Sequence, residues 1–184
     1  MQDMHQSSVT LVLGGVRSGK SRYAQQLAEQ SRRVVFVATA KPSDDEMRRK
    51  IDRHREERPK EWLTVEEPLE LVRVLAQHEQ DCDVIVVDCL TIFAANLLEE
   101  ENEDRVAIEH RVAALCSALV TVGCDVVLVS NEVGSGVVPA YELGRRYRDL
   151  LGEINQSVAR AADDVVLMVA GLPLALKGHI EVTP

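Results

Sequence analysis

The sequence GGVRSGKS occupies residues 14–21 and directly follows an apolar run at residues 9–13. It fits the pattern G-x-x-x-x-G-K-[S/T], and its place between an expected strand and an expected helix is the context in which this pattern binds phosphate. The glycines allow backbone N–H groups to converge on an anion, and the helix adds its positive end. We expect Lys20 to contact the β and γ phosphates of a nucleotide and Ser21 to bind Mg²⁺. The residues of this loop expected to bind nucleotide are Gly14, Gly15, Val16, Arg17, Ser18, Gly19, Lys20 and Ser21.

Apolar runs alternate with amphipathic stretches along the rest of the chain. The runs expected to form strands buried on both faces of a parallel sheet are 34–38, 84–87, 126–129 and 165–169, with a further short strand around 62–65. The stretches expected to form helices are 21–31, 68–80, 103–122 and 141–162. This alternation predicts an α/β protein in one domain, with a mostly parallel central sheet flanked by helices.

Composition and charge exclude several classes of function. The 184 residues carry 21 Lys+Arg and 30 Asp+Glu, which gives a net charge of −9. An acidic chain with 3% aromatic residues is a poor candidate for nucleic-acid binding, which depends on phosphate neutralisation and base stacking. No apolar run approaches the length of a membrane span, and the four cysteines show no metal-ligand spacing. We therefore expect a cytoplasmic protein with free cysteines, no nucleic-acid partner and no integral membrane segment.

An acidic residue, Asp88, ends the apolar run at 84–87. In parallel sheets, ligands bind at the carboxyl ends of the strands. Beside a phosphate-binding loop, Asp88 is expected to join Ser21 in holding Mg²⁺. The alternative is that Asp88 caps the helix that follows, near Thr91.

A strongly charged segment follows the second expected strand and is expected to form a helix that ends before Pro59. Met47, Ile51 and His54 share one face of this helix, so His54 would turn toward the body of the protein. A neutral imidazole is a competent nucleophile near pH 7, and Arg55 beside it suits phosphate. On these residues alone, a half-buried surface histidine remains the favoured alternative.

Motifs spread over most of the chain resemble one known enzyme family. The matching segments are 14–22, 38–40, 44–47, His54 with Arg58-Pro59 and Trp62, 131–134, 136–139, 148–149, Gly152 and 155–156. They resemble the bifunctional adenosylcobinamide kinase/adenosylcobinamide-phosphate guanylyltransferase family of cobalamin biosynthesis. Some members carry two adjacent histidines, whereas here Arg53 precedes His54. The matching segments lie within residues 9–177, which would form the single domain; residues 1–8 and 178–184 would be loose termini.

The resemblance implies two reactions. In the first, a nucleoside triphosphate (ATP or GTP) phosphorylates adenosylcobinamide. In the second, GTP guanylylates a histidine of the enzyme, which matches His54 here, and GMP passes to adenosylcobinamide phosphate to give adenosylcobinamide-GDP. The further nucleotide contacts that the resemblance implies are Ala38, Thr39, Ala40, Arg55, Glu56, Glu57, Arg58, Glu66 and Asp88. It also implies a RecA-like P-loop NTPase fold and a homotrimer.

Other interpretations of the residues stay open. The chain could be a small-molecule P-loop kinase that forms no covalent nucleotide, or a RecA-type regulatory module without enzyme activity. Glu132, after the strand expected at 126–129, could order the next loop, assist substrate binding or pair with an arginine. The helix expected at 141–162 carries Leu143, Tyr147 and Leu151 on one face, and a solvated or subunit-contacting face opposite.

Overall fold

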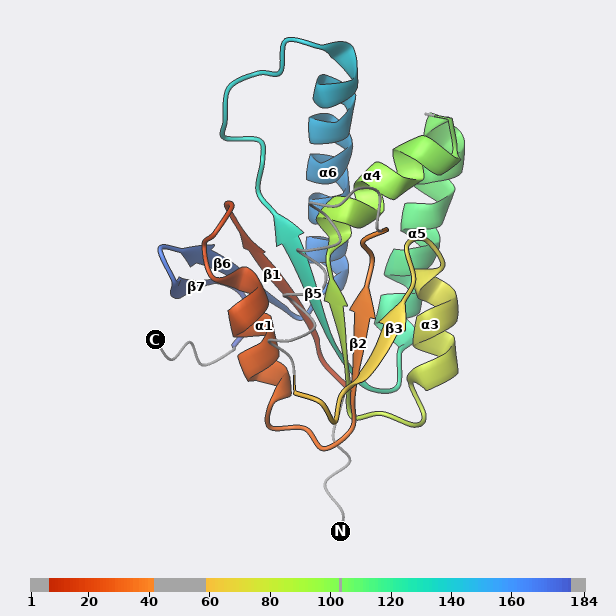
Figure 1. Ribbon diagram of the computed structural model, residues 1–184, viewed down its shortest axis with the longest axis vertical. Coiled ribbons are helices and arrows are strands. Elements are labelled where there is room, and N and C mark those ends of the chain that lie inside the picture. Colours follow the sequence, from red (N-terminus) through yellow and green to blue (C-terminus); the bar gives the residue numbers. More distant parts are fainter. Residues whose placement is uncertain (1–6, 42–58, 103, 180–184) are drawn as a thin grey trace.

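In the part of the chain that the structure describes, seven strands form one sheet in the order β3-β2-β4-β5-β1-β6-β7. Figure 1 shows it in the computed structural model, which describes residues 7–41, 59–102 and 104–179. In chain order the strands are β1 (Val9–Gly14), β2 (Val34–Ala38), β3 (Leu63–Glu66), β4 (Val84–Asp88), β5 (Asp125–Asn131), β6 (Asp164–Val169) and β7 (Leu172–Lys177). Neighbouring strands are parallel except β6 and β7, which pair antiparallel. The α/β fold with a mostly parallel sheet is confirmed, and so is the short strand expected around residues 62–65.

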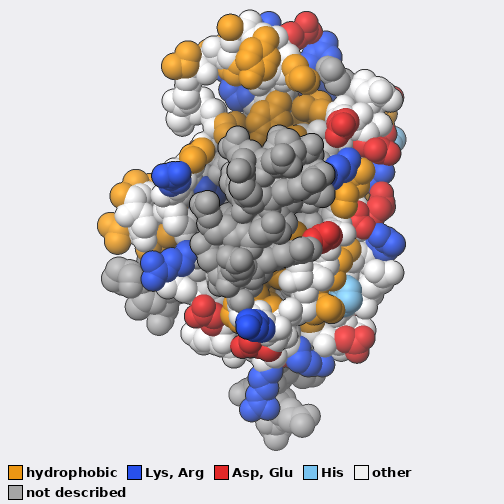
Figure 2. Space-filling view, in the orientation of Figure 1, with side chains coloured by type: hydrophobic (Ala, Val, Ile, Leu, Met, Phe, Trp, Pro, Cys, Tyr) orange, Lys and Arg blue, Asp and Glu red, His pale blue; other side chains and the backbone are white. Residues whose placement is uncertain are grey.

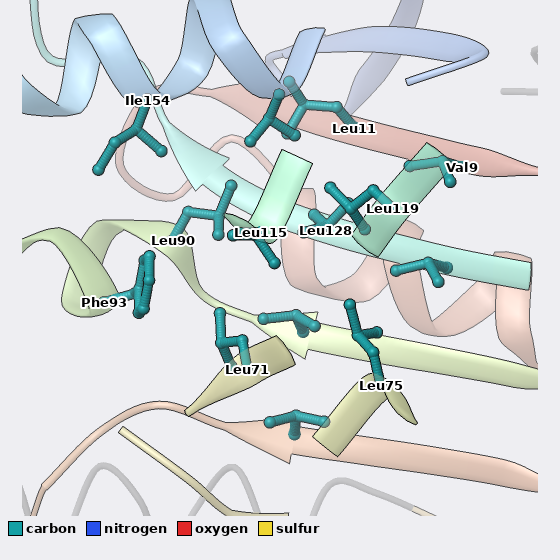
Figure 3. Packing of buried hydrophobic residues seen from close by; sticks show 14 of the residues in the cluster. Val9, Leu11, Leu71, Leu75, Leu90, Phe93, Leu115, Leu119, Leu128 and Ile154 are labelled. Carbon is teal, nitrogen blue, oxygen red and sulfur yellow. The ribbon is translucent and has the colours of Figure 1, made fainter. Parts of the chain in front are cut away.

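Helices cover both faces of the sheet (Figure 1). They are α1 (Lys20–Ala28), α3 (Leu71–His78), α4 (Leu90–Glu100), α5 (Arg105–Thr121) and α6 (Glu142–Ala161). Within the described residues, α1 packs on one face, and α3 to α6 pack on the other. Because side chains alternate along a strand, Leu11 faces the large layer of helices while Val12 faces α1. In Figure 3, Leu11 and Leu128 from the sheet and Leu115 from α5 lie in one apolar layer.

Some boundaries differ from those that the sequence pattern predicts. The helix expected from Pro68 begins at Leu71, because the Glu67 carboxylate accepts hydrogen bonds from the backbone N–H groups of Leu69 and Glu70 and holds a turn there. Helix α4 and strand β7 were not expected. The four cysteines are free, and Cys82 and Cys124 are buried while the other two are half-buried.

Helix α6 extends past the carboxyl edge of the sheet (Figure 1). Leu151 and Ile154, in its middle, are fully buried, as their spacing predicts. Leu143 was expected on the same buried face but is 53% exposed, because no strand lies under the first turn of the helix. The loop between β5 and α6 also stands above the sheet edge.

Candidate active site

The loop after β1 has a backbone that only glycine permits at two positions. At Gly14 (φ 154°), a Cβ would lie 2.6 Å from the Met168 carbonyl oxygen and 2.5 Å from Ser18 Oγ. Gly19 (φ 98°) is the N-cap of α1, and no side chain caps this helix end. The N-terminus of α1 is therefore open to an anion, which its backbone N–H groups and dipole favour.

The turn between β6 and β7 supports this loop from beside it. The Gly171 N–H donates to the Ser18 carbonyl oxygen over 3.0 Å. Gly14 lies against Met168 of β6, as described above. The Ser18 hydroxyl is buried and has no hydrogen-bond partner among the described residues. The shape of the loop thus depends on the last two strands of the sheet.

Lys20 folds over the same loop. Its ammonium group donates to the Gly15 carbonyl oxygen over 2.6 Å, and only 8% of the residue is exposed. Burial lowers the pKa of Lys20 below its usual value, while the neighbouring Cys89 and the Asp88 carboxylate act in the opposite direction. A cation with an unfavourable desolvation energy is suited to an incoming phosphate, which would supply the missing counter-charge.

The ends of β2 and β4 are tied together by Thr39, which is fully buried. Its hydroxyl accepts from the Cys89 N–H over 2.9 Å and donates to the Cys89 carbonyl over 2.8 Å. The Asn96 amide donates to the carbonyl oxygens of Thr39 (2.9 Å) and Pro68 (3.0 Å). The side chain of Thr39 therefore positions Asp88 and Cys89. The backbone of Thr39 is also hydrogen-bonded, because its N–H donates to the Asp88 carbonyl over 3.2 Å and its carbonyl accepts from Asn96. The nucleotide contact expected of Thr39 stays a prediction. Sequence reasoning missed Asn96, because nothing in its local pattern marks a polar residue inside an apolar helix as functional.

A second buried polar network closes the end of β5. Ser130 Oγ donates to Asn155 Oδ1 over 2.6 Å, and Asn155 Nδ2 donates to the Asn131 carbonyl over 3.0 Å. The Asn131 N–H donates to Thr91 Oγ1 over 2.9 Å. The Glu132 N–H donates to the Gly14 carbonyl over 3.0 Å, which joins this network to the phosphate-binding loop. The motif residues Asn131 and Asn155 thus shape the edge of the site.

The sheet register brings together most of the candidate residues that the structure describes. Ala38 pairs with both Glu66 and Asp88, and Gly14 pairs with Asn131 at the same edge. Gly15, Val16 and Arg17 are exposed on the loop after β1, where a ligand can reach them. Asp88 is half-buried, and the N-cap of α4 is Cys89, so the alternative of Asp88 as the N-cap residue does not hold.

The charged segment with the candidate nucleophile lies outside the described residues. This applies to His54 and to the nucleotide contacts Arg55, Glu56, Glu57 and Arg58. Their roles stay predictions.

A metal ion at this edge would have few protein ligands. Residues 7–41, 59–102 and 104–179 contain no cluster of three or more His, Cys, Asp or Glu side chains that could hold one. Mg²⁺ is commonly bound through one or two side-chain oxygens together with substrate phosphates. Ser21 and Asp88 offer such oxygens, so the residues present fit a metal carried by the nucleotide.

Comparison with known proteins places this site in a family. The sequence profile of the CobU family, described as cobinamide kinase / cobinamide phosphate guanyltransferase, matches residues 10–176. The chain belongs to this family. It is 45% identical over 170 residues to the bifunctional adenosylcobalamin biosynthesis protein CobP of Pseudomonas aeruginosa, covering 92% of this chain and 97% of that protein. It is 38% identical over 178 residues to the bifunctional adenosylcobalamin biosynthesis protein CobU of Escherichia coli, covering 91% and 98%.

Solved structures show the same fold at low sequence identity. An ATPase from a bacterial type III secretion system superimposes with a TM-score of 0.57 at 11% identity, covering 87% of this chain and 50% of that one. A protein from Pyrococcus horikoshii OT3 gives a TM-score of 0.57 at 7% identity, covering 95% and 88%. These likenesses support the fold of the CobU-family chain alone. Among its described helices, none has the length and apolar character that crossing a membrane requires.

Proposed function

We propose that the protein phosphorylates adenosylcobinamide with a nucleoside triphosphate and then transfers GMP from GTP to adenosylcobinamide phosphate, giving adenosylcobinamide-GDP. The observation that carries this proposal is a phosphate-binding loop, GGVRSGKS, inside a family match that spans residues 10–176. One domain, residues 9–177, would hold both activities. We further infer a homotrimer, as the family resemblance implies, and a cytoplasmic location, as the composition of the sequence predicts.

The guanylyl transfer would use His54 as nucleophile. A ring nitrogen attacks the α-phosphorus of GTP, a P–N bond forms, and pyrophosphate leaves with the electrons of the broken P–O bond. The guanylylated ring then passes its remaining N–H proton to water. A phosphate oxygen of adenosylcobinamide phosphate attacks the same phosphorus, and the P–N bond breaks with its electrons returning to the ring, which takes a proton back from water and becomes neutral imidazole again. Covalent catalysis of this kind divides one difficult displacement into two easier ones.

Several residues would hold the triphosphate during both reactions. Lys20 would exchange its bond to the Gly15 carbonyl for the β and γ phosphates, and the N–H groups of the loop would surround them. Ser21 and Asp88 would hold Mg²⁺, which when bound neutralises charge on the phosphates. Arg55 and Arg58 would add positive charge near the α-phosphate. The kinase step needs mainly alignment and charge neutralisation, so the same triphosphate-binding loop serves both reactions.

The decisive experiment follows label from the α-phosphate of GTP onto the protein. The wild-type protein should carry label that is stable to base and labile to acid, and His54→Ala should carry none. His110→Ala is the matched control, because His110 is exposed on α5 and should leave labelling unchanged. Label that survives His54→Ala would place the nucleophile elsewhere. Phosphorylation of adenosylcobinamide without any labelling would indicate a kinase that forms no covalent nucleotide, and absence of both would indicate a regulatory module.

A further inference from the structure

The loop between β5 and α6 and the first turn of α6 turn apolar side chains into solvent. Val137 is 96% exposed, Val138 is 60% exposed, Tyr141 is 70% exposed, and Leu143 is exposed as described above. We call these four residues the apolar loop face. Figure 2 shows hydrophobic side chains gathered on the upper, projecting part of the molecule, where this loop lies. Exposed apolar side chains that gather in one place often form a binding surface.

Several contacts hold the loop in this conformation. The Arg145 guanidinium donates to the carbonyl oxygens of Pro139 (3.0 Å) and Ala140 (2.9 Å), which fixes the loop to α6. Gly144 leaves room for the ring of Tyr141, whose Cε2 would lie 2.7 Å from a Cβ at that position. Because these contacts hold the backbone of the loop against α6, the apolar side chains are kept in their exposed positions.

The loop starts at the edge of the phosphate-binding site. Asn131 pairs with Gly14 in the sheet, and the Glu132 N–H donates to the Gly14 carbonyl. An acceptor that takes a phosphoryl group must place its hydroxyl at the nucleotide, while the rest of the molecule lies outside the phosphate-binding loop. A surface that begins beside Gly14 and projects beyond the sheet edge is well placed to bind the part of the acceptor molecule that lies outside the phosphate-binding loop.

We propose that the apolar loop face binds the corrin macrocycle of adenosylcobinamide. This inference rests on the proposed function. The macrocycle is large, flat and mostly apolar, with amide groups at its rim, so it gains from burying apolar side chains and from the flat ring of Tyr141. Its amide N–H groups can donate to exposed backbone carbonyl oxygens and to the Glu132 carboxylate, one oxygen of which already accepts from the Gly134 N–H over 3.0 Å.

The other exposed apolar strip of the described residues is less well placed. Leu172, Leu174 and Leu176 are more than half exposed along β7. Leu172 pairs with Val169 near the phosphate-binding loop, but the strand then runs antiparallel to β6, and Lys177 pairs with Val165 at the opposite end. Most of this strip therefore leads away from the nucleotide.

The test measures binding of adenosylcobinamide to the full chain by equilibrium dialysis, with the Kd for GTP measured on the same samples. Val137→Asp should weaken corrinoid binding by about tenfold or more, because an exposed valine that becomes buried against a ligand contributes about 1.5 kcal/mol. The Kd for GTP should stay at the wild-type value. Val137→Leu keeps the apolar surface and should bind the corrinoid as the wild type does.

Val120→Asp is the matched control, because Val120 is also exposed but lies near the end of α5, away from the phosphate-binding loop. It should bind both ligands normally. Wild-type corrinoid affinity in Val137→Asp would overturn the proposal. So would weakened binding that accompanies a change in molecular mass by sedimentation, because the face would then contact a second copy of the chain. If the wild-type protein binds the corrinoid but neither phosphorylates nor guanylylates it, the proposed function fails while the docking site is still decided by the variants.

Discussion

Replacing Thr39 with valine removes one buried hydroxyl and keeps the size of the side chain. The Cys89 N–H then loses its partner, whereas the Cys89 carbonyl keeps a hydrogen bond from the Phe93 N–H at 3.2 Å. Leaving one buried donor unsatisfied costs about 1–3 kcal/mol, so we expect Thr39→Val to lose about 2 kcal/mol of unfolding free energy. Thr39→Ser keeps the hydroxyl and loses only a methyl group, which should cost about 1 kcal/mol.

Urea unfolding measures this difference directly. The free energy of unfolding falls by about 2 kcal/mol per molar urea. The midpoint urea concentration should therefore be about 1 M lower for Thr39→Val than for the wild type, and about 0.5 M lower for Thr39→Ser. Because Thr39 positions Asp88 and Cys89, kcat/KM of both reactions should fall in the valine variant and recover in the serine variant. A valine variant within about 0.5 kcal/mol of the wild type, with full activity, would refute the assigned role of this hydroxyl.

Three further variants test the site and its supports. Lys20→Met should reduce kcat/KM at least about 100-fold in both reactions, because both lose the cation that binds the phosphates. Urea unfolding of this variant should show no loss of stability, because the buried ammonium group is unfavourable in the absence of nucleotide. Gly14→Ala should lose at least about 2 kcal/mol, because its Cβ would collide with the Met168 carbonyl, whereas Gly15→Ala meets no atom within 4 Å and should unfold like the wild type. Burial raises the pKa of Glu67, but backbone N–H groups and Arg73 outweigh it and hold that pKa below 4.5. A lowered folded-state pKa stabilises the protein above pH 4.5 and ceases to do so as the pH falls through the folded value, so unfolding free energy should fall less steeply in acid for Glu67→Gln than for the wild type.

Much of the fold followed from local patterns, and the two missed elements show why some did not. Strands β1, β2, β4, β5 and β6 are short, nearly continuous apolar runs rich in valine, which the sequence pattern identifies. Helix α4 follows β4 with only Cys89 between them, so no turn signal separates two apolar segments. Strand β7 contains Pro173 and lacks β-branched residues, and its pairing with β6 depends on a turn at Gly171 that the pattern did not mark.

The parts of the candidate site that a short sequence motif defines could be predicted from the sequence. The parts that depend on contacts between residues far apart in the chain could not. The phosphate-binding loop and the strand-end Asp88 follow from short patterns. The hydroxyl of Thr39 bonds to a residue fifty positions away, so no local pattern reveals that it ties two strand ends together. The exposure of Leu143 depends on how far α6 runs past the sheet, which periodicity does not contain.

The contact between the β6–β7 turn and the phosphate-binding loop has a consequence for biosynthesis. Strand β1 leaves the ribosome first, yet its sheet neighbours β5 and β6, and the Gly171 N–H that bonds to Ser18, are translated more than a hundred residues later. A nascent chain therefore contains the phosphate-binding motif long before the residues that support this loop have been synthesised. Until then, both edges of β1 lack their partner strands. Ribosome-bound chains halted before residue 171 should fail to retain GTP, and they are the species on which chaperones would act.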